Sequence, residues 1–352
     1  MKVLLTGGMG YLGTHTAIVL LEAGHKVVLY DNFSNSKATV HRRLETITQT
    51  TIPLIDGDVR DTALLEATLH KYNINVVIHF AGLKAVGESV QKPIDYYDNN
   101  VGGTISLLKA MNTAGVKQLV FSSSATVYGQ PQYLPLDENH ATSATNPYGR
   151  TKLQIEEILS DVARADPGWS IACLRYFNPV GSHSSGLIGE DPNTIPSNLM
   201  PYMARVASGH LPYLNIFGDN YDTQDGTGVR DYIHVMDLAE GHRAALDFLN
   251  TQTGWHAINL GTGRGYSVFE MIQAFEIACG QTIPYQIVDR RPGDVSACYA
   301  QVEKAKTLLK WQASRSLEDM CASAWQFIRN QTLKQSPLLS HNQPLYSMEK
   351  VK

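Results

Sequence analysis

The first half of the chain alternates short apolar runs with longer segments whose apolar residues have helical spacing. The runs carry almost continuous aliphatic and β-branched residues, as strands do when both faces of a sheet are covered. Neighbouring parallel strands need a crossover connection, so this alternation predicts an α/β fold with a doubly wound parallel sheet of the Rossmann type. The expected strands are residues 2–6, 26–31, 52–56, 76–81, 118–123 and 171–177, and the expected helices are residues 11–23, 63–71, 94–114 and 148–165.

The pattern loosens after about residue 179, where glycine and proline become frequent. We therefore expect a dinucleotide-binding domain over residues 1–179, to which later segments return, and a smaller, partly interwoven substrate lobe over residues 180–330. Residues 331–352 are polar and are expected to form a loose tail. Helices are expected in the substrate lobe at residues 199–208, 235–249, 268–279, 302–309 and 317–329.

Composition narrows the class of protein. The 352 residues carry a formal charge of -4 with dispersed lysines and arginines, which favours neither nucleic acid nor an anionic membrane as a partner. The four cysteines lie far apart without a CxxC pair, which argues against a zinc site or a disulfide framework. The sequence shows neither a signal peptide nor an apolar run of membrane-spanning length. We expect a cytoplasmic protein without a metal.

The first predicted strand leads into a glycine-rich turn and a helix. Gly7, Gly10 and Gly13 allow a sharp turn and let backbone N–H groups approach a pyrophosphate at the helix N-terminus. Asp31 ends the next strand, where a carboxylate accepts hydrogen bonds from ribose hydroxyls and repels a 2′-phosphate. Together these features predict a dinucleotide site that prefers NAD to NADP.

Further polar and small residues follow the third and fourth predicted strands, at the sheet edge where open α/β sheets bind ligands. Asp58, followed by Val59, is a candidate for the adenine edge. Ala81 and Gly82, after Phe80, would let the cofactor approach closely, and Lys84 is a candidate for ribose or phosphate oxygens. The nearby His79 is expected to be a packed core histidine.

Tyr148 and Lys152 stand four positions apart on a predicted helix, so their side chains share one face. A phenol with a pKa near ~10 is a poor base at neutral pH, and a neighbouring ammonium and an oxidised nicotinamide ring would both lower that pKa. Ser122 and Ser124 end the fifth predicted strand. Ser124 can hydrogen-bond a substrate hydroxyl and hold it against the tyrosine.

The glycine turn, Asp31, Ser124 and the tyrosine–lysine pair resemble the extended short-chain dehydrogenase/reductase superfamily. Within it, the strings HFAGLKAVGES (79–89), LRYFNPVG (174–181) and GTGVRDYIHV (226–235) resemble UDP-glucose 4-epimerases. The resemblance implies roles for further residues. Around the NAD it implies Tyr11, Leu12, Asp31, Asn32, Ser36, Asn99, Ser122 and Phe177, and around the UDP moiety it implies Asn178, Asn198, Leu199, Arg230, Arg291 and Asp294.

The activity that the resemblance implies is inversion of C4 of a UDP-hexose, interconverting UDP-glucose and UDP-galactose. The C4–H of an alcohol is not acidic, so the expected route oxidises C4 with bound NAD and returns the hydride to the opposite face of a 4-keto sugar. A sugar-nucleotide 4,6-dehydratase is an alternative, although Ser124-Ala125-Thr126 lacks the carboxylate that the elimination needs. A non-catalytic NAD-sensing protein is a second alternative.

Two finer expectations also come from the resemblance. Cys298 stands where epimerases restricted to UDP-glucose and UDP-galactose commonly carry a tyrosine, so N-acetylated UDP-hexoses are expected to fit as well. The other reading is that Cys298 is simply a small buried residue, with Tyr299 able to fill the gap. A homodimer is expected, through residues 94–114 and 148–165.

Overall fold

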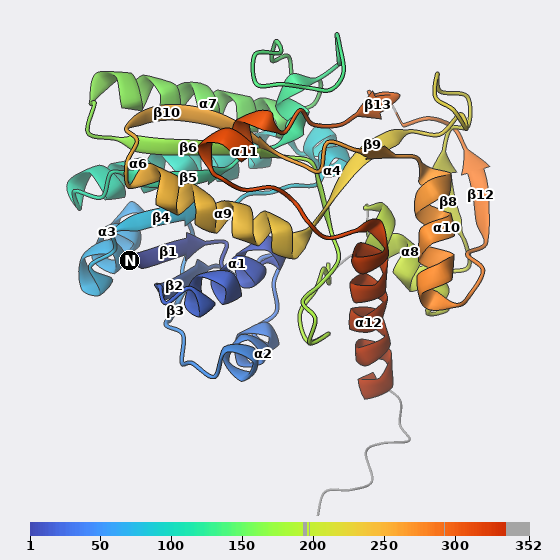
Figure 1. The fold of residues 1–352 in the computed structure, drawn as a ribbon. Helices are drawn as coiled ribbons and strands as arrows, with labels where there is room; N and C mark the ends of the chain where they lie inside the picture. Colours follow the sequence, from blue (N-terminus) through green and yellow to red (C-terminus); the bar gives the residue numbers. More distant parts are fainter. Residues whose placement is uncertain (193–195, 197, 292, 336–352) are drawn as a thin grey trace, which may run out of the picture.

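The computed structural model describes residues 1–192, 196, 198–291 and 293–335. Seven strands form one sheet in the order β10-β6-β5-β4-β1-β2-β3, and each neighbouring pair runs parallel. This confirms the doubly wound fold class (Figure 1). The strands are β1 (Lys2–Thr6), β2 (Lys26–Asp31), β3 (Leu54–Asp56), β4 (Val76–His79), β5 (Gln118–Ser122), β6 (Ser170–Tyr176) and β10 (Gly254–Leu260).

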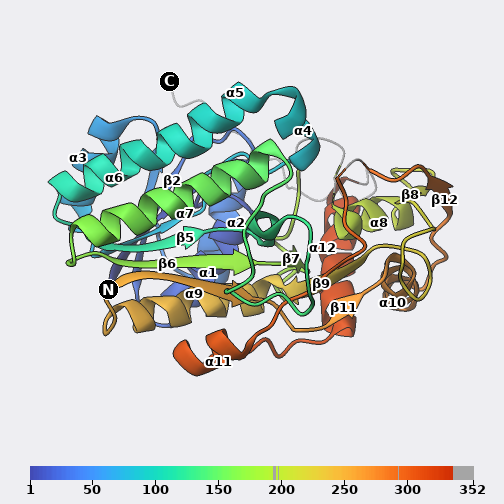
Figure 2. The same ribbon diagram turned by 90° about the horizontal axis from the view of Figure 1, so that it is seen from above.

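Helices cover both faces of this sheet, and the strand sequences show why. On β1, Val3 and Leu5 pack into one core cluster, whereas Leu4 packs into the cluster on the opposite face. Continuous apolar runs are therefore required. Figure 2 shows α6 and α7 side by side over one face, with α9 below the sheet. The flanking helices are α1 (Tyr11–Glu22), α2 (Thr39–Thr48), α3 (Thr62–Tyr72), α6 (Gly103–Thr113), α7 (Pro147–Ala165) and α9 (Val235–Leu249), with α11 (Glu303–Leu308) beside β10.

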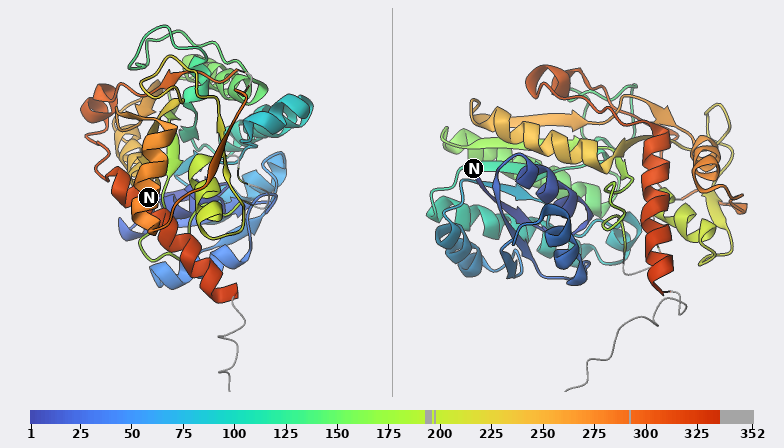
Figure 3. Two further views of the ribbon diagram at one scale, coloured as in Figure 1. Left: turned by 90° about the vertical axis from the view of Figure 1, so that its right-hand side faces the viewer. Right: turned by 60° about the horizontal axis from the view of Figure 1, so that its bottom comes forward.

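A C-terminal lobe packs against the carboxyl edge of the sheet around a separate core cluster. In Figure 3, α12 stands between the parallel-sheet lobe and the helices α8 and α10. Strand β9 pairs with β7, β11 and β13, and β8 pairs with β12. The elements are β7 (Asn178–Val180), α8 (Leu199–Ala207), β8 (Leu214–Phe217), β9 (Val229–His234), β11 (Gly265–Tyr266), α10 (Val268–Cys279), β12 (Tyr285–Val288), β13 (Ala297–Cys298) and α12 (Leu317–Gln335).

Three sequence expectations need correction. The helix expected at residues 94–114 is α5 (Pro93–Tyr96), a π-helical turn η1 (Tyr97–Gly102) and then α6. Helix α12 continues to Gln335, so a tail beginning at residue 331 starts too early; the rest of that tail lies outside the described residues. Strand β10 was not expected; it lies at the edge of the sheet, and only its last four residues are buried, so its apolar run is short. The division between residues 179 and 180 stays a prediction.

Candidate active site

The turn between β1 and α1 requires glycine at several positions, of which Gly7 and Gly13 are the most restricted. Gly7 has a φ of +66°, and a Cβ there would lie 2.7 Å from the Ala81 backbone nitrogen. A Cβ on Gly13 would lie 2.5 Å from the Gly7 carbonyl oxygen. Within the described residues, no side chain caps the first turn of α1, which starts after Gly10. Its backbone N–H groups are therefore open to an anion.

Asp31 ties the glycine turn to the loop after β2. Its buried carboxylate accepts hydrogen bonds from the backbone nitrogens of Met9 and Phe33, both at 2.9 Å, and from Ser36 Oγ at 2.9 Å. A carboxylate offers about four acceptor positions, so it can still accept from a ribose hydroxyl. Asn32 lies beside it, and its amide donates to Asp58 at 3.1 Å.

Asp58 is held in an ion-pair network at the end of β3. Arg60 donates to both of its carboxylate oxygens, with the closest guanidinium contact at 2.8 Å, and reaches Asp98 at 2.6 Å. The Arg60 guanidinium holds the pKa of Asp58 well below its usual range. The next residue, Val59, is buried against Gly103 of α6. The ion pairs of Arg60 with Asp58 and Asp98 therefore fix the position of the residues expected at the adenine edge.

Lys152 is buried in the protein at the centre of the site, with 4% exposure. Helix α7 begins at Pro147, and Asn146 caps it by accepting from the Gly149 nitrogen at 2.8 Å. From this helix Lys152 Nζ donates to the Ser122 carbonyl oxygen at 2.6 Å and lies 5.9 Å from the centre of the Tyr148 ring. Burial lowers the pKa of Lys152 to about 8.

The protein alone does not lower the pKa of Tyr148, contrary to the expectation for an ammonium neighbour. Burial raises the pKa of this phenol, and the Ser124 hydroxyl opposes that rise. The ammonium of Lys152 is directed to a backbone carbonyl, so burial of Tyr148 dominates. A phenolate here needs a further positive charge at the site.

The serines after β5 have different partners. Ser124 Oγ accepts from the Thr126 nitrogen at 3.2 Å and from Thr126 Oγ1 at 3.0 Å, so its own proton is left for the Tyr148 oxygen or, in its place, a substrate oxygen. Ser122 Oγ is hydrogen-bonded to the hydroxyl of Tyr176. The hydroxyl of Ser122 binds Tyr176 and its carbonyl oxygen accepts from Lys152. The expected contact of Ser122 with the cofactor stays a prediction.

The loop after β4 is joined to α7 by Asn100, a residue that the sequence analysis did not single out. Asn100 is buried in the π-helical turn; its side-chain oxygen accepts from the Leu83 nitrogen at 2.7 Å and its amide donates to Thr151 Oγ1 at 3.0 Å. Asn99 donates to the same side-chain oxygen at 3.0 Å. The packing of His79, hydrogen-bonded to Thr6 at 2.6 Å, agrees with its expected core role.

The residues expected around the cofactor have their own places at this edge. Phe80 and Ala81 follow β4 and donate their backbone N–H groups to the Thr6 carbonyl, and Gly82 comes next. Tyr11 hydroxyl donates to the Gly181 carbonyl oxygen at 2.7 Å, at the point where β7 leads into the C-terminal lobe. The remaining members are Leu12 on α1, Phe177, buried between β6 and β7, and Lys84, paired with Glu190.

The residues expected around UDP gather in the C-terminal lobe. Asn178, Arg230 and Cys298 lie on the adjacent strands β7, β9 and β13. Asp294 forms an ion pair with Arg230, and the Arg291 guanidinium lies 3.8 Å from the centre of the Phe217 ring. The last two, Asn198 and Leu199, start helix α8, where the Asn198 amide donates to Glu190.

Comparison with known proteins places the chain in a family. UDP-glucose 4-epimerase of Bacillus subtilis (strain 168) is 54% identical over 93% of this chain and 96% of its own length. The Homo sapiens UDP-glucose 4-epimerase is 55% identical over 93% of this chain and 96% of its own. The chain belongs to the UDP-glucose 4-epimerase family. The family model described as GDP-mannose 4,6 dehydratase matches residues 4–324.

Solved structures of family members share this fold. UDP-glucose 4-epimerase from Bifidobacterium longum, in complex with NAD+ and UDP, has a TM-score of 0.92 at 54% identity and covers 94% of this chain and 99% of its own. The epimerase from Stenotrophomonas maltophila, with bound NAD and formylated UDP-arabinopyranose, has a TM-score of 0.93 at 49% identity, covering 95% and 99%. A 4,6-dehydratase needs a carboxylate directly after the serine at the position of Ser124. In this chain the residues after Ser124 form a 3₁₀ turn, Ala125–Tyr128, with the sequence ATVY and no carboxylate.

Proposed function

We propose that this chain interconverts UDP-glucose and UDP-galactose by oxidising and re-reducing C4 with a resident NAD. The observation that carries the proposal is the placement of Tyr148 beside the buried Lys152 and within hydrogen-bonding reach of the Ser124 hydroxyl. The chain carries this site within 54–56% identity to epimerases over 93% of its length. A non-catalytic NAD-sensing role would leave the tyrosine and lysine without a purpose.

The residues at the carboxyl edge of the sheet fit NAD. Gly7 and Gly13 keep the turn free of side chains, and the first turn of α1 offers N–H groups to a pyrophosphate. Asp31 has acceptor positions for an unphosphorylated ribose. When bound, NAD supplies a hydride acceptor and donor and, in its oxidised form, a positive ring beside Tyr148.

Tyr148 acts as the base in the oxidative direction. The C4 hydroxyl donates its proton to the phenolate oxygen as the C4–H bond breaks with its electron pair and the C4–O bond becomes a carbonyl. Ser124 donates its hydroxyl proton to the same C4 oxygen and holds it against Tyr148. The buried cation of Lys152 favours the phenolate. When the 4-keto sugar is reduced on its other face, Tyr148 returns the proton to the C4 oxygen and gives the alcohol of opposite configuration.

Inversion requires that the nucleotide stay fixed while the hexose turns over. The diphosphate is well matched by the guanidinium groups of Arg230 and Arg291. Asp294 forms an ion pair with Arg230, and Asn178, Asn198 and Leu199 belong to β7 and the start of α8 in the same lobe. Binding energy placed on the remote UDP group leaves the sugar free to present either face to Tyr148.

We extend the proposal to N-acetylated UDP-hexoses. Cys298 sits in the short strand β13, in register with Arg230 on β9. A thiol is much smaller than the phenol expected in a restricted epimerase, which leaves room beside the sugar C2. Burial raises the pKa of Cys298 to about 11, so the thiol stays neutral beside the sugar.

A homodimer is part of the proposal, with the cytoplasm as its location. Val90 of α4 (Val86–Gln91) and Ile94 of α5 are 63% and 81% exposed, next to the helices α6 and α7. Apolar side chains of this size favour burial against a second copy of the chain. The four cysteines are free thiols, as a reducing compartment would keep them. Among the described residues, no helix has the length and apolar character needed to cross a bilayer.

The proposed function is tested by incubating the purified protein with UDP-galactose without added NAD and separating the products. UDP-glucose is the expected product, because the cofactor is resident and is regenerated in each cycle. Release of NADH in proportion to substrate would instead indicate a net dehydrogenase. Formation of a 4-keto-6-deoxy sugar nucleotide would indicate the dehydratase alternative.

A further inference from the structure

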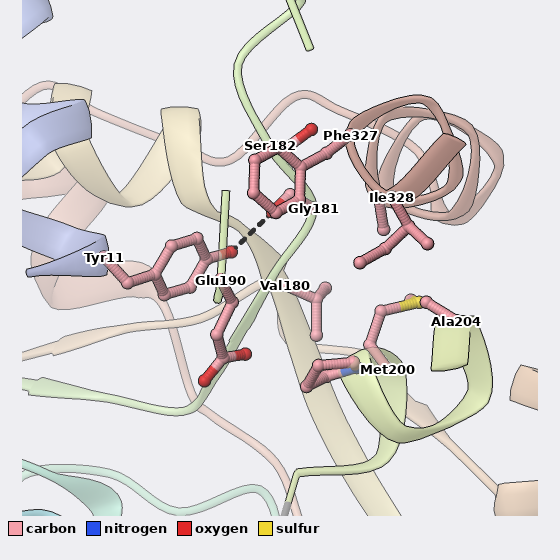
Figure 4. Close-up of a pocket in the computed structure, with 11 residues that line it drawn as sticks. Tyr11, Val180, Gly181, Ser182, Glu190, Met200, Ala204, Phe327 and Ile328 are labelled. Atoms are coloured by element: carbon pink, nitrogen blue, oxygen red, sulfur yellow. Dashed lines mark hydrogen bonds between the residues drawn. The ribbon is translucent and has the colours of Figure 1, made fainter. Parts of the chain in front are cut away.

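One carboxylate oxygen joins a residue expected at the cofactor to a residue expected at UDP. Glu190 Oε1 accepts a hydrogen bond from Lys84 Nζ at 3.0 Å and another from the Asn198 side-chain amide at 2.8 Å. The Glu190 side chain is 11% exposed. Figure 4 shows Glu190 beside the Tyr11 ring, with its carboxylate turned away from Phe327. None of the site motifs in the sequence includes Glu190.

The donors come from opposite sides of the site. Lys84 lies in the loop after β4, in the parallel-sheet lobe, and Asn198 precedes α8 in the C-terminal lobe. Asparagine is a favoured N-cap residue, yet in the described structure its side chain does not cap α8 and instead binds Glu190. The amide is therefore oriented by Glu190 rather than by its own helix.

Each donor keeps capacity for a ligand while it is bound to Glu190. A lysine ammonium has three N–H donors, and an asparagine amide has a second N–H and a carbonyl oxygen. A cofactor oxygen on Lys84 and a nucleotide oxygen or N–H on Asn198 can therefore be bound together with the Glu190 contacts. The hydrogen bonds among Lys84, Glu190 and Asn198 already exist before a ligand binds. The first ligand adds a partner to one end of this chain of contacts and restricts the remaining motion of Glu190, so the second ligand loses less conformational entropy when it binds the other end.

We propose that Glu190 is a positioning residue that couples retention of NAD to binding of the UDP moiety. This inference rests on the proposed function for the roles of Lys84 and Asn198. Reciprocity requires that UDP strengthen the hold on NAD by the same factor as NAD strengthens the hold on UDP. Coupling of this kind keeps the cofactor in place during the part of the cycle in which it carries the hydride.

The test measures the rate at which the purified holoenzyme loses NAD, with and without saturating UDP. In the unaltered protein we expect UDP to slow the loss on the order of fivefold or more. Glu190→Ala should abolish this effect. Glu190→Gln should retain part of it, because the amide oxygen still accepts both hydrogen bonds. If Glu190→Ala does not fold, the reduced UDP effect in Glu190→Gln carries the test.

Asp191→Ala is the matched control. Asp191 is the next residue and forms an exposed ion pair with Lys37 at 2.5 Å, without a contact to Asn198 among the described hydrogen bonds. This variant should keep the full UDP effect. The inference is overturned if UDP has no effect on NAD loss in the unaltered protein, if Glu190→Ala or Glu190→Gln keeps the whole effect, or if Asp191→Ala loses as much. The rate of NAD loss is measured without catalytic turnover. An absence of epimerase activity would therefore contradict the proposed function, whereas the coupling by Glu190 is judged from NAD loss alone.

Discussion

Glu156→Gln should lower the free energy of unfolding, because it removes one charge of a buried ion pair. Glu156 and Arg175 are buried, with side-chain exposures of 2% and 5%. The Glu156 carboxylate accepts from Arg175 at 2.6 to 3.1 Å and from Ser123 Oγ at 2.5 Å. Neutralising one partner of a buried ion pair leaves the other charge uncompensated, which costs about 3–5 kcal/mol.

The assay is urea unfolding at pH 7.5 with NAD at saturation in every sample, because bound ligand adds to stability. Glu157→Gln is the control, since Glu157 is the next residue on α7 and its side chain is exposed. The control should change the free energy of unfolding by no more than about 0.5 kcal/mol. A loss below about 1 kcal/mol in Glu156→Gln, or equal losses in both variants, would refute the reasoning.

The same substitution should also alter the pH profile. The negative charge of Glu156 raises the pKa of Lys152, whereas burial lowers it to about 8. Removing that charge should lower the pKa of Lys152 further. The decline of kcat/KM at high pH, where Lys152 loses its proton, should then begin at a lower pH. An unchanged decline would show that Lys152 does not need its proton for turnover.

Substitutions in the site and a buried histidine of the core give further expected outcomes. Tyr148→Phe should lower kcat about 10²- to 10⁴-fold while the variant still binds NAD and UDP, and near-normal turnover would exclude Tyr148 as the base. Lys152→Ala should move the rise of activity with pH to a higher pH, because the phenol loses its cationic neighbour. Asp31→Ala should weaken NAD binding and relax the rejection of NADP, and an unchanged preference would exclude its ribose role. Cys298→Tyr should remove activity on UDP-N-acetylglucosamine while sparing UDP-glucose, a claim that fails if the unaltered protein is inert toward the N-acetylated sugar. Burial lowers the pKa of His79 from 6.5 to about 3, so the unfolded chain binds more protons than the folded chain below pH 6.5. His79 alone should therefore reduce the stability by about 1 kcal/mol per pH unit as the pH drops toward 3, in addition to the effect of His15, His234 and His242, whose pKa values burial also lowers. Denaturation between pH 7 and 4 measures this loss, and His79→Gln should make the dependence shallower.

Features that depend on neighbouring residues in the chain were predictable from sequence. The turn from Gly7 to Gly13 has local steric requirements, and Tyr148 and Lys152 share a helix face by spacing alone. The apolar strands were predictable because β1 and its neighbours are buried on both faces. Strand ends were less certain, and β3 begins two residues later than expected.

Features that depend on distant partners were not predictable. Strand β10 is an edge strand that pairs with β6, a strand remote in sequence, and β12 is only four residues long with three of them exposed, so neither belongs to a long buried apolar run. In the sequence, Asn100 cannot be told from any other polar residue of a helix. Its importance depends on the π-helical turn, which places its side chain against Leu83 and Thr151. Glu190 is likewise ordinary in sequence, because its two partners lie 106 positions before it and 8 positions after it.

In the proposed mechanism, the hydrogen removed from C4 returns to the same carbon on the opposite face. Epimerisation of UDP-galactose in D2O, followed by mass spectrometry and proton NMR of the UDP-glucose formed, tests this claim most directly. We predict a product without deuterium at C4, because the hydride stays within the closed cycle while only the hydroxyl proton held by Tyr148 exchanges with solvent. Deuterium at C4 of the product would contradict the mechanism, since it would show that inversion proceeds by proton exchange at carbon.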